Sequence, residues 1–158
     1  MKAFVFSIGE KTTELCCQLL REQGLEVILY QDQTSLWDKL KRFYTQALES
    51  EDDEFMRVDA DIIPFKNAHC MENNWGWTCA QGWDWYKQKV GAISIHKMRR
   101  EVVELCLANI ESAHYENRPE SHLWRLSDIN KKTKLSFGTY GLHGYGQQAE
   151  SRLRLGVN

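Results

Sequence analysis

The sequence predicts an α/β fold whose first half is built on a parallel sheet, and two observations support this prediction. Three apolar runs, at 2–9, 25–30 and 55–58, have the length and composition of buried strands. The two segments between them space their apolar residues as one face of an α-helix does. Strands that alternate with helices in this order form parallel sheets with right-handed crossovers.

Both helices of the first half have recognisable boundaries. The first is expected over 12–23, after which Gly24 should stop it. The second should begin after Ser35, whose hydroxyl can cap the first turn. The residues expected on the apolar faces are Leu15, Leu19 and Leu20 in the first helix, and Leu36, Leu40, Phe43, Ala47 and Leu48 in the second.

The second half is less regular. Residues 67–89 hold four tryptophans and show no helical spacing, whereas 90–95 has the composition of a strand. An amphipathic helix is expected over 98–113, followed by a short helix that starts at Pro119 and a last strand over 134–141.

The chain contains no linker, repeat or low-complexity segment. We therefore expect one domain over 1–158, with a regular half over 1–66 and an irregular half over 67–158.

Composition excludes several classes of protein. The net charge is −2, the pI is about 6.2 and no basic run is present, which argues against a nucleic-acid partner. No apolar run approaches the roughly 18 residues of a transmembrane segment. Five cysteines without an export signal favour free thiols in the cytoplasm. His69, Cys70 and Cys79 lack a Cys-x-x-Cys pair, which disfavours a zinc site.

Two aspartates interrupt an apolar stretch in Val-Asp-Ala-Asp-Ile-Ile, residues 58–63. In an extended segment, Asp59 and Asp61 face the same side, at the carboxyl end of the third strand, where open α/β sheets bind ligands. Paired carboxylates repel each other, and a hard divalent cation such as Mg²⁺ or Mn²⁺ relieves that repulsion. The alternative is a strand end whose carboxylates meet water, a lysine or backbone amides.

Two βα units followed by a strand ending in Val-Asp-Ala-Asp-Ile-Ile-Pro resemble the nucleotide-diphospho-sugar glycosyltransferases of the GT-A fold. The resemblance implies a three-layer α/β/α sandwich on a mixed, mostly parallel sheet, with a Rossmann-like nucleotide-binding half. It implies that Asp59 lies near the donor ribose and the metal, and that Asp61 binds Mn²⁺ or Mg²⁺ directly. Residues 1–66 would then form the nucleotide-sugar-binding half, and 67–158 the acceptor-side half.

The same resemblance assigns further contacts to the donor. Ser7 and Gly9 stand in the place of the donor-binding loop, and Asp32 stands where an acidic nucleotide contact is often found. His143 follows the last strand and is similar to a histidine that binds the metal or the diphosphate. An exposed or structurally satisfied histidine is the alternative.

On the acceptor side, Asn-Arg-Pro-Glu-Ser-His-Leu-Trp resembles a motif whose carboxylate is the catalytic base. Glu120 is the first candidate and Asp84 the second. Ser121 stands where some members have a second acid, and Glu120 is otherwise a residue favoured at a helix start. Gly91 would allow close approach of the acceptor. The aromatic residues expected to bind the acceptor sugar, or else to fill the core, are Trp75, Trp77, Trp83, Trp85 and Tyr86.

The expected function is therefore metal-dependent transfer of a sugar from a nucleoside diphosphate to the hydroxyl group of a carbohydrate or another acceptor. One alternative is a shortened nucleotide- or sugar-binding scaffold without turnover, because the chain is short for this family. A phosphatase of the haloacid-dehalogenase type is less favoured. Its nucleophilic aspartate lies on the first strand, whereas here the pair follows the third strand and precedes Ile62 and Ile63.

Overall fold

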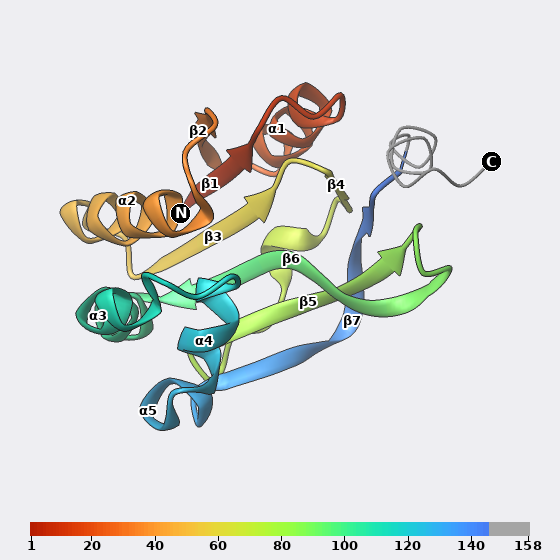
Figure 1. The fold of residues 1–158 in the computed structure, drawn as a ribbon. Coiled ribbons are helices and arrows are strands. Elements are labelled where there is room, and N and C mark those ends of the chain that lie inside the picture. Colours follow the sequence, from red (N-terminus) through yellow and green to blue (C-terminus); the bar gives the residue numbers. More distant parts are fainter. Residues whose placement is uncertain (146–158) are drawn as a thin grey trace.

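The computed structural model describes residues 1–145, in which seven strands form one sheet in the order β2-β1-β3-β6-β5-β7-β4 (Figure 1). Pairing is parallel between β1 and both β2 and β3, and between β5 and β7. Strand β6 runs antiparallel to β3 and β5, and β4 runs antiparallel to β7. The strands are β1 (Lys2–Ser7), β2 (Glu26–Gln31), β3 (Glu54–Asp59), β4 (Ile62–Pro64), β5 (Trp77–Asp84), β6 (Lys89–Arg99) and β7 (Thr133–His143).

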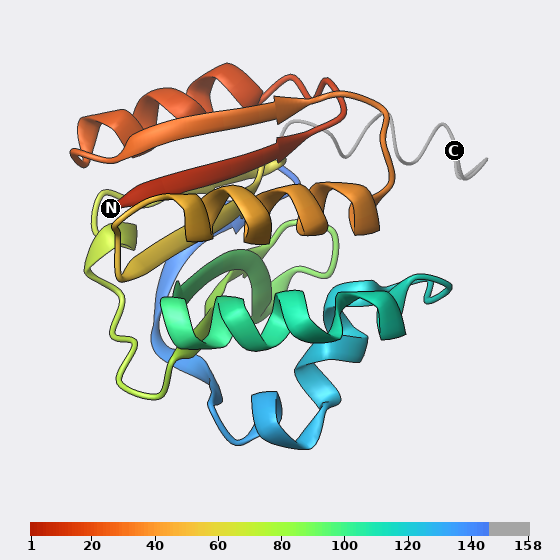
Figure 2. The ribbon, with the colours of Figure 1, turned by 90° about the vertical axis from the view of Figure 1, so that its left-hand side faces the viewer.

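Helices cover both faces of this sheet. One face carries α1 and the short 3₁₀ helix η1, and the other carries α2 and α3, which lie side by side in Figure 2, together with α4. The expected three-layer sandwich and the mixed sheet are confirmed, and three of the six strand pairs within residues 1–145 are parallel. The helices are α1 (Thr13–Glu22), α2 (Leu36–Glu49), α3 (Arg100–Asn109), α4 (Pro119–Arg125) and α5 (Ser127–Asn130), with 3₁₀ helices η1 (Ala68–Cys70) and η2 (Ile110–Ala113).

Strand β1 separates two apolar cores. Phe4 and Phe6 pack towards α2, whereas Ala3 and Val5 pack towards α1. Because successive side chains of a strand point to opposite faces, an unbroken apolar run is what a strand covered on both sides requires. Strand β1 thereby holds its carboxyl end, which begins the candidate site, in the middle of the sheet.

Local signals explain where the helices begin and end. The Ser35 hydroxyl accepts a hydrogen bond from the Asp38 amide at 3.1 Å and thus caps α2, as expected. Gly24, with a φ of +80°, follows α1 in the left-handed region that favours glycine. Pro119 occupies the first turn of α4.

The buried face of α1 differs from the expected one. Thr13, Cys16, Cys17 and Leu20 are buried, whereas Leu15 is 41% exposed. The small thiol side chains follow the same three- and four-residue spacing as an apolar face, and they let the helix lie close to the sheet. The expectation that Leu15 faces the core is wrong.

The tryptophan-rich segment is not irregular throughout, because residues 77–84 form β5, which lies between β6 and β7. A register shift between Cys79 and Gln81 breaks the simple alternation that marks a strand in sequence. Strand β6 extends to Arg99, so α3 begins at Arg100 rather than at 98. The short edge strand β4 was not expected.

The strands approach each other closely at Gly82. This residue pairs with Gly91 of β6, and a Cβ atom at position 82 would overlap the Gly141 carbonyl oxygen and the Ile93 side chain. Strand β5 therefore needs a glycine at this point.

Residues 1–145 contain no helix that is both long and apolar enough to cross a membrane.

Candidate functional site

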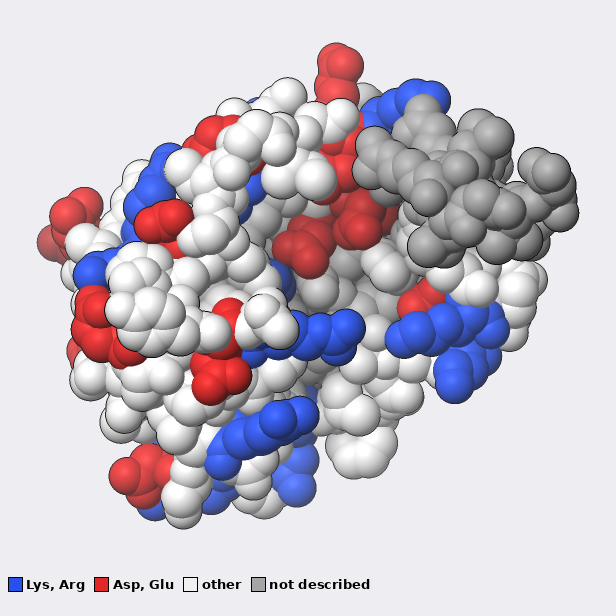
Figure 3. All heavy atoms as spheres, in the orientation of Figure 1, with Lys and Arg blue, Asp and Glu red and all other residues white. Residues whose placement is uncertain are grey.

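An acidic cavity of about 180 Å³ opens at the carboxyl ends of β1 and β3. Asp59 and Asp61 both line it, but the expected extended segment ends at Asp59, and Asp61 lies in the turn between β3 and β4. Figure 3 shows acidic side chains gathered in a hollow near the centre of this face. The other polar residues that line it are Ser7, Glu10, Thr34 and Lys39. The edge where open α/β sheets bind ligands is therefore rich in carboxylates.

His143 lies between Asp61 and Asp84, the second candidate base, and contacts both carboxylates. Its Nε2 lies 3.1 Å from Asp61 Oδ2, and its Nδ1 lies 3.3 Å from Asp84 Oδ2. The hydrogen bond to Asp61 raises the pKa of His143 above its ordinary value, with Asp84 adding to the effect and burial opposing it. With a carboxylate at each ring nitrogen, a protonated imidazole can donate a hydrogen bond to both, while the role of His143 as a metal or diphosphate ligand stays a prediction.

Asp61 itself fits a cation. Its Oδ1 atom is buried and has no hydrogen-bond partner among residues 1–145. An orphaned carboxylate oxygen beside a second carboxylate suits a hard cation such as Mg²⁺ or Mn²⁺. No group of three or more potential ligands converges within residues 1–145. Such a cation would thus take one or two carboxylates from the protein and further oxygens from substrate and water, which is the usual pattern for Mg²⁺.

The cysteines do not form a site within the described part of the chain. All five are free thiols, and Cys70 is the exposed one. Its Sγ lies 3.2 Å from His69 Nε2, and Cys79 is buried in β5.

A buried arginine links the acidic cavity to Glu120. Arg57 Nη2 lies 3.1 Å from Asp59 Oδ1, and its Nη1 lies 3.2 Å from Glu120 Oε2. Burial opposes ionisation of Glu120, but Arg57 and then His96 outweigh it and lower the pKa to about 2. At Asp59, burial outweighs the attraction of Arg57, and the pKa is raised.

His96 continues this network into the core. The indole Nε1 of Trp77 donates to His96 Nδ1 at 2.9 Å, and His96 Nε2 lies 3.2 Å from Glu120 Oε1. An indole N–H can only donate, so Nδ1 accepts and the ring proton is on Nε2, facing Glu120. His96 therefore orients the Glu120 carboxylate.

Neither candidate base has the environment of a strong proton acceptor. Glu120 is held ionised by Arg57, as described above. At Asp84, burial opposes ionisation, but the Lys87 amide and His143 outweigh it and lower the pKa. Asp84 Oδ1 also accepts from the Tyr86 and Lys87 amides, each at 3.0 Å, and so caps the turn after β5.

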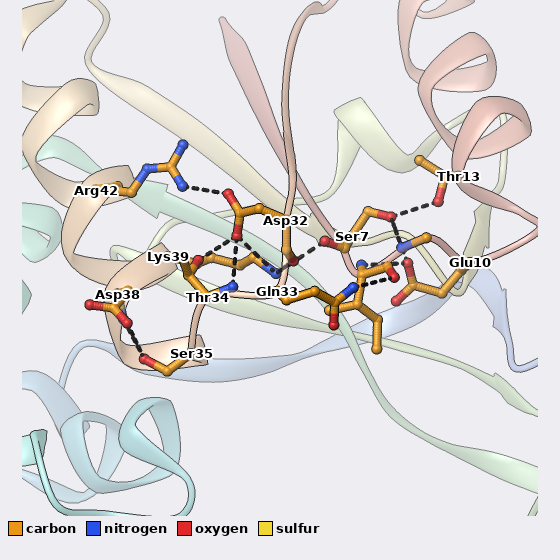
Figure 4. Close-up of polar contacts among 12 residues, drawn as sticks. Ser7, Glu10, Thr13, Asp32, Gln33, Thr34, Ser35, Asp38, Lys39 and Arg42 are labelled. Carbon is orange, nitrogen blue, oxygen red and sulfur yellow. Dashed lines mark hydrogen bonds and ion pairs between the residues drawn. The ribbon is translucent and has the colours of Figure 1, made fainter.

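The loop after β1 uses its polar groups internally (Figure 4). The Ser7 hydroxyl donates to Glu10 Oε2 at 2.6 Å and lies 2.8 Å from Thr13 Oγ1. The Gly9 amide donates to Ser7 Oγ at 2.9 Å, and the Ile8 amide donates to Glu10 Oε2 at 2.9 Å. Ser7 lines the cavity as expected, while the positive φ of Gly9, +100°, shapes the turn.

Asp32 is directed at its own loop (Figure 4). It accepts from the Thr34 hydroxyl and amide and from Arg42 Nη1, the last at 2.7 Å, and these bonds lower its pKa. Lys39 is buried and donates to the Ser7 and Asp32 carbonyl oxygens at 3.0 and 2.8 Å. The structure thus brings Ser7, Asp59 and Asp61 to one cavity, whereas Asp32 does not line it. Sequence reasoning missed Lys39, although a lysine on the apolar face of a helix was a signal.

The four tryptophans do not share one surface. Trp77 is fully buried and packs edge-on against Trp124 with ring centroids 4.8 Å apart, so it belongs to the core. Trp75 is 56% exposed and lines a separate cavity of about 540 Å³, with Lys134 Nζ 4.7 Å from its ring centroid. Trp85 packs edge-on against Tyr145, and Trp83 is half-buried in β5.

Gly91 has open space where a side chain would be, so local packing does not require a glycine there.

Besides the cavity that Trp75 lines, a second cavity adjoins the Arg57 network, on its α4 side, with a volume of about 520 Å³. Glu120 and His96 line it together with Trp124, which sequence reasoning did not single out. The acidic cavity and this second cavity are therefore connected through the ion pairs of one buried arginine.

No protein-family model matches the chain. No curated protein matches it either. Among solved structures, a glycosyltransferase involved in glycosylation of the major capsid of PBCV-1 is similar over 100% of both chains, with a TM-score of 0.61 and 11% identity. A 4-diphosphocytidyl-2C-methyl-D-erythritol synthase from Anaerococcus prevotii is similar over 99% of this chain and 96% of its own, with a TM-score of 0.63 and 8% identity. At these identities, the similarity establishes the fold.

Proposed function

We propose that the protein is a metal-dependent glycosyltransferase that moves a sugar from a nucleoside diphosphate to an acceptor hydroxyl. The observation that carries the proposal is the pair Asp59 and Asp61, which share one cavity at the carboxyl end of β3, with one Asp61 oxygen buried and unpartnered among residues 1–145. The PBCV-1 glycosyltransferase, which matches the whole chain in fold, supports the same assignment.

In this proposal, Asp61 and Asp59 would hold Mn²⁺ or Mg²⁺. When bound, such an ion would supply positive charge against the departing nucleoside diphosphate. Residues 1–66 supply the donor side, where Lys39 holds the ends of β1 and β2 together through two carbonyl oxygens. Residues 67–158 supply the acceptor side. Among the tryptophans, Trp75 is exposed and Trp83 and Trp85 are half-buried, and these three are proposed to contact sugars.

Glu120 acts in this scheme as a positioning residue. Its carboxylate balances the charge of Arg57, which in turn fixes Asp59 at the cavity wall. A general base works best with a pKa near the working pH, and a carboxylate with a pKa of about 2 is far from that optimum. Asp84 in the same way orients His143 against Asp61.

Synthesis of a nucleotide-linked compound is a second candidate, because the synthase from Anaerococcus prevotii has the same fold. The loop after β1 argues against it. Glu10 faces this loop, and the Ile8 and Gly9 amides are already bonded, so a triphosphate would find a carboxylate there instead of free donors. A binding scaffold without turnover is the third candidate.

A thermal-shift screen tests the proposal. UDP-, GDP- and CMP-sugars are added to the wild type with and without Mn²⁺, and the stabilising donor is then tested on Asp61→Asn and on the control Asp128→Asn. Asp128 lies on α5, is exposed and pairs with Lys131. It lines neither the acidic cavity nor the second cavity. We expect Mn²⁺-dependent stabilisation that Asp61→Asn loses and the control keeps. An equal response of both variants contradicts the metal site.

Turnover assays separate the three candidates. Release of the nucleoside diphosphate from the stabilising donor supports sugar transfer. Release of pyrophosphate from a nucleoside triphosphate supports the synthase instead. Donor binding without either product identifies a scaffold.

We also propose a reducing, cytoplasmic location, because all five cysteines are free thiols.

A further inference from the structure

The second cavity has a basic rim. Lys87 comes from the turn between β5 and β6, Arg118 precedes α4 and Arg125 is its last residue, and all three residues line the cavity. In Figure 3, basic side chains lie below the acidic group at the centre of the face. The whole chain has a net charge of −2, so this concentration of positive charge is local.

These cations are not matched by nearby carboxylates. None of the ion pairs within residues 1–145 includes Arg118 or Arg125, and Lys87 makes one looser contact, 3.7 Å from Asp84. Glu120 lines the same cavity, but it is outnumbered by the three cations, and Arg57, which it shares with Asp59, lies 3.2 Å from it. The cavity therefore presents an excess of positive charge to whatever enters it.

The rest of the lining suits a small organic molecule. Trp124 and Leu135 provide apolar surface, and Ser94 and Ser121 provide hydroxyls. A volume of about 520 Å³ is within the range of small-ligand pockets. Arginine forks bind phosphate and carboxylate groups through paired charge-assisted hydrogen bonds.

We infer that this cavity binds an acceptor that carries an anionic group, a phosphate or a carboxylate, beside its hydroxyls. The inference rests on the proposed function in taking the ligand to be the acceptor. The ion pairs of Arg57 with Glu120 and Asp59 join the wall of this cavity to the wall of the acidic cavity, where the donor diphosphate is proposed to lie. Arg118 and Arg125 would hold the anion, and Trp124 would pack against the ring.

Calorimetric titration of the full chain tests this inference with three probes that share one sugar ring: glucose 6-phosphate, glucuronate and glucose. We expect at least one anionic sugar to bind about tenfold or more tightly than glucose, since hydrogen bonds to charged groups are strong. Preference for the first or the second probe identifies a phosphate or a carboxylate. Equal binding of glucose, or no binding of either anionic sugar, overturns the inference.

The double variant Arg118→Gln/Arg125→Gln tests whether these two arginines bind the anionic group. Both side chains are exposed, so the fold should tolerate the change. We expect affinity for the anionic sugar to fall by about 10- to 100-fold. The control Arg21→Gln removes an exposed arginine of α1 and should bind as the wild type does. Unchanged affinity in the double variant overturns the inference.

Donor binding is measured on the same samples. If the double variant loses affinity for the nucleotide sugar instead, the arginines serve the donor and the inference fails while the proposed function stands. If the wild type binds the anionic sugar but no nucleotide sugar, the anion site stands and the glycosyltransferase proposal fails.

Discussion

The guanidinium of Arg57 lies 3.1 Å from the carboxylate of Asp59, and the arginine side chain is only 1% exposed. The two residues are neighbours on one face of β3, since they are two positions apart in a strand. A charge buried this deeply is tolerated only when it is paired and hydrogen-bonded. Arg57 therefore contributes to the stability of the sheet and also fixes the position of the Asp59 carboxylate.

Removing this buried charge should be costly. We expect Arg57→Met to lower the free energy of unfolding by about 3 to 5 kcal/mol, because it leaves Asp59 and Glu120 without their cation. The control is Arg42→Met, which breaks a 2.7 Å contact with Asp32 that is half exposed. That variant should lose no more than about 1 kcal/mol. Urea denaturation measures both, and similar losses would contradict the buried-charge interpretation.

Stability should fall in acid through Glu120. Its pKa is lowered from an ordinary 4.5 to about 2, so the ionised carboxylate stabilises the folded state above about pH 4.5. That stabilisation is lost as the pH falls towards 2. We expect Glu120→Gln to be less stable than the wild type near neutral pH and to approach it in acid. Melting temperatures over this range check the prediction, and a pH-independent difference would count against it.

Catalysis should depend on Glu120 only moderately. General-base catalysis contributes roughly 100- to 10,000-fold, and a base with so low a pKa is poorly matched to that task. We expect Glu120→Gln to lower kcat by less than about 100-fold and to leave the shape of the pH–rate profile unchanged. The loss of an acidic limb from the profile would identify Glu120 as the base after all.

Gly82 and Gly91 are paired across β5 and β6, yet alanine should affect them differently. Gly82→Ala places a methyl group against the Gly141 carbonyl and Ile93, which should destabilise the fold by about 1 to 3 kcal/mol. Gly91→Ala meets open space and should change stability little. Chemical denaturation of the two variants compares them directly. If Gly91→Ala raises KM for the acceptor without a change in stability, Gly91 contacts the acceptor as expected.

The first half of the fold could be predicted because its signals are local. Apolar runs and helical spacing within 1–66 determine the order of strands and helices. Asp59 and Asp61 could be placed at the carboxyl edge of the sheet because they follow the third apolar run. The turn that brings Asp61 to the same cavity was not predicted.

The second half could not be predicted in the same way. The register shift at Cys79 and Gln81 hides the alternation of β5, and the aromatic residues around it look the same whether they are buried or exposed. The Arg57 network joins positions that are 63 residues apart, which a single sequence does not pair. The one available signal was a charged residue within the apolar run Phe-Met-Arg-Val.

Four of the five cysteines are buried, and Cys70 is exposed at the wall of the cavity that Trp75 lines. A maleimide dye should therefore attach at one position in the native protein without any mutagenesis. Trp75 lines the same cavity, so it can transfer excitation energy to this dye, and a Trp75→Phe variant separates its share from that of the other five tryptophans. A sugar that displaces Lys134 from the indole face should change the emission of Trp75.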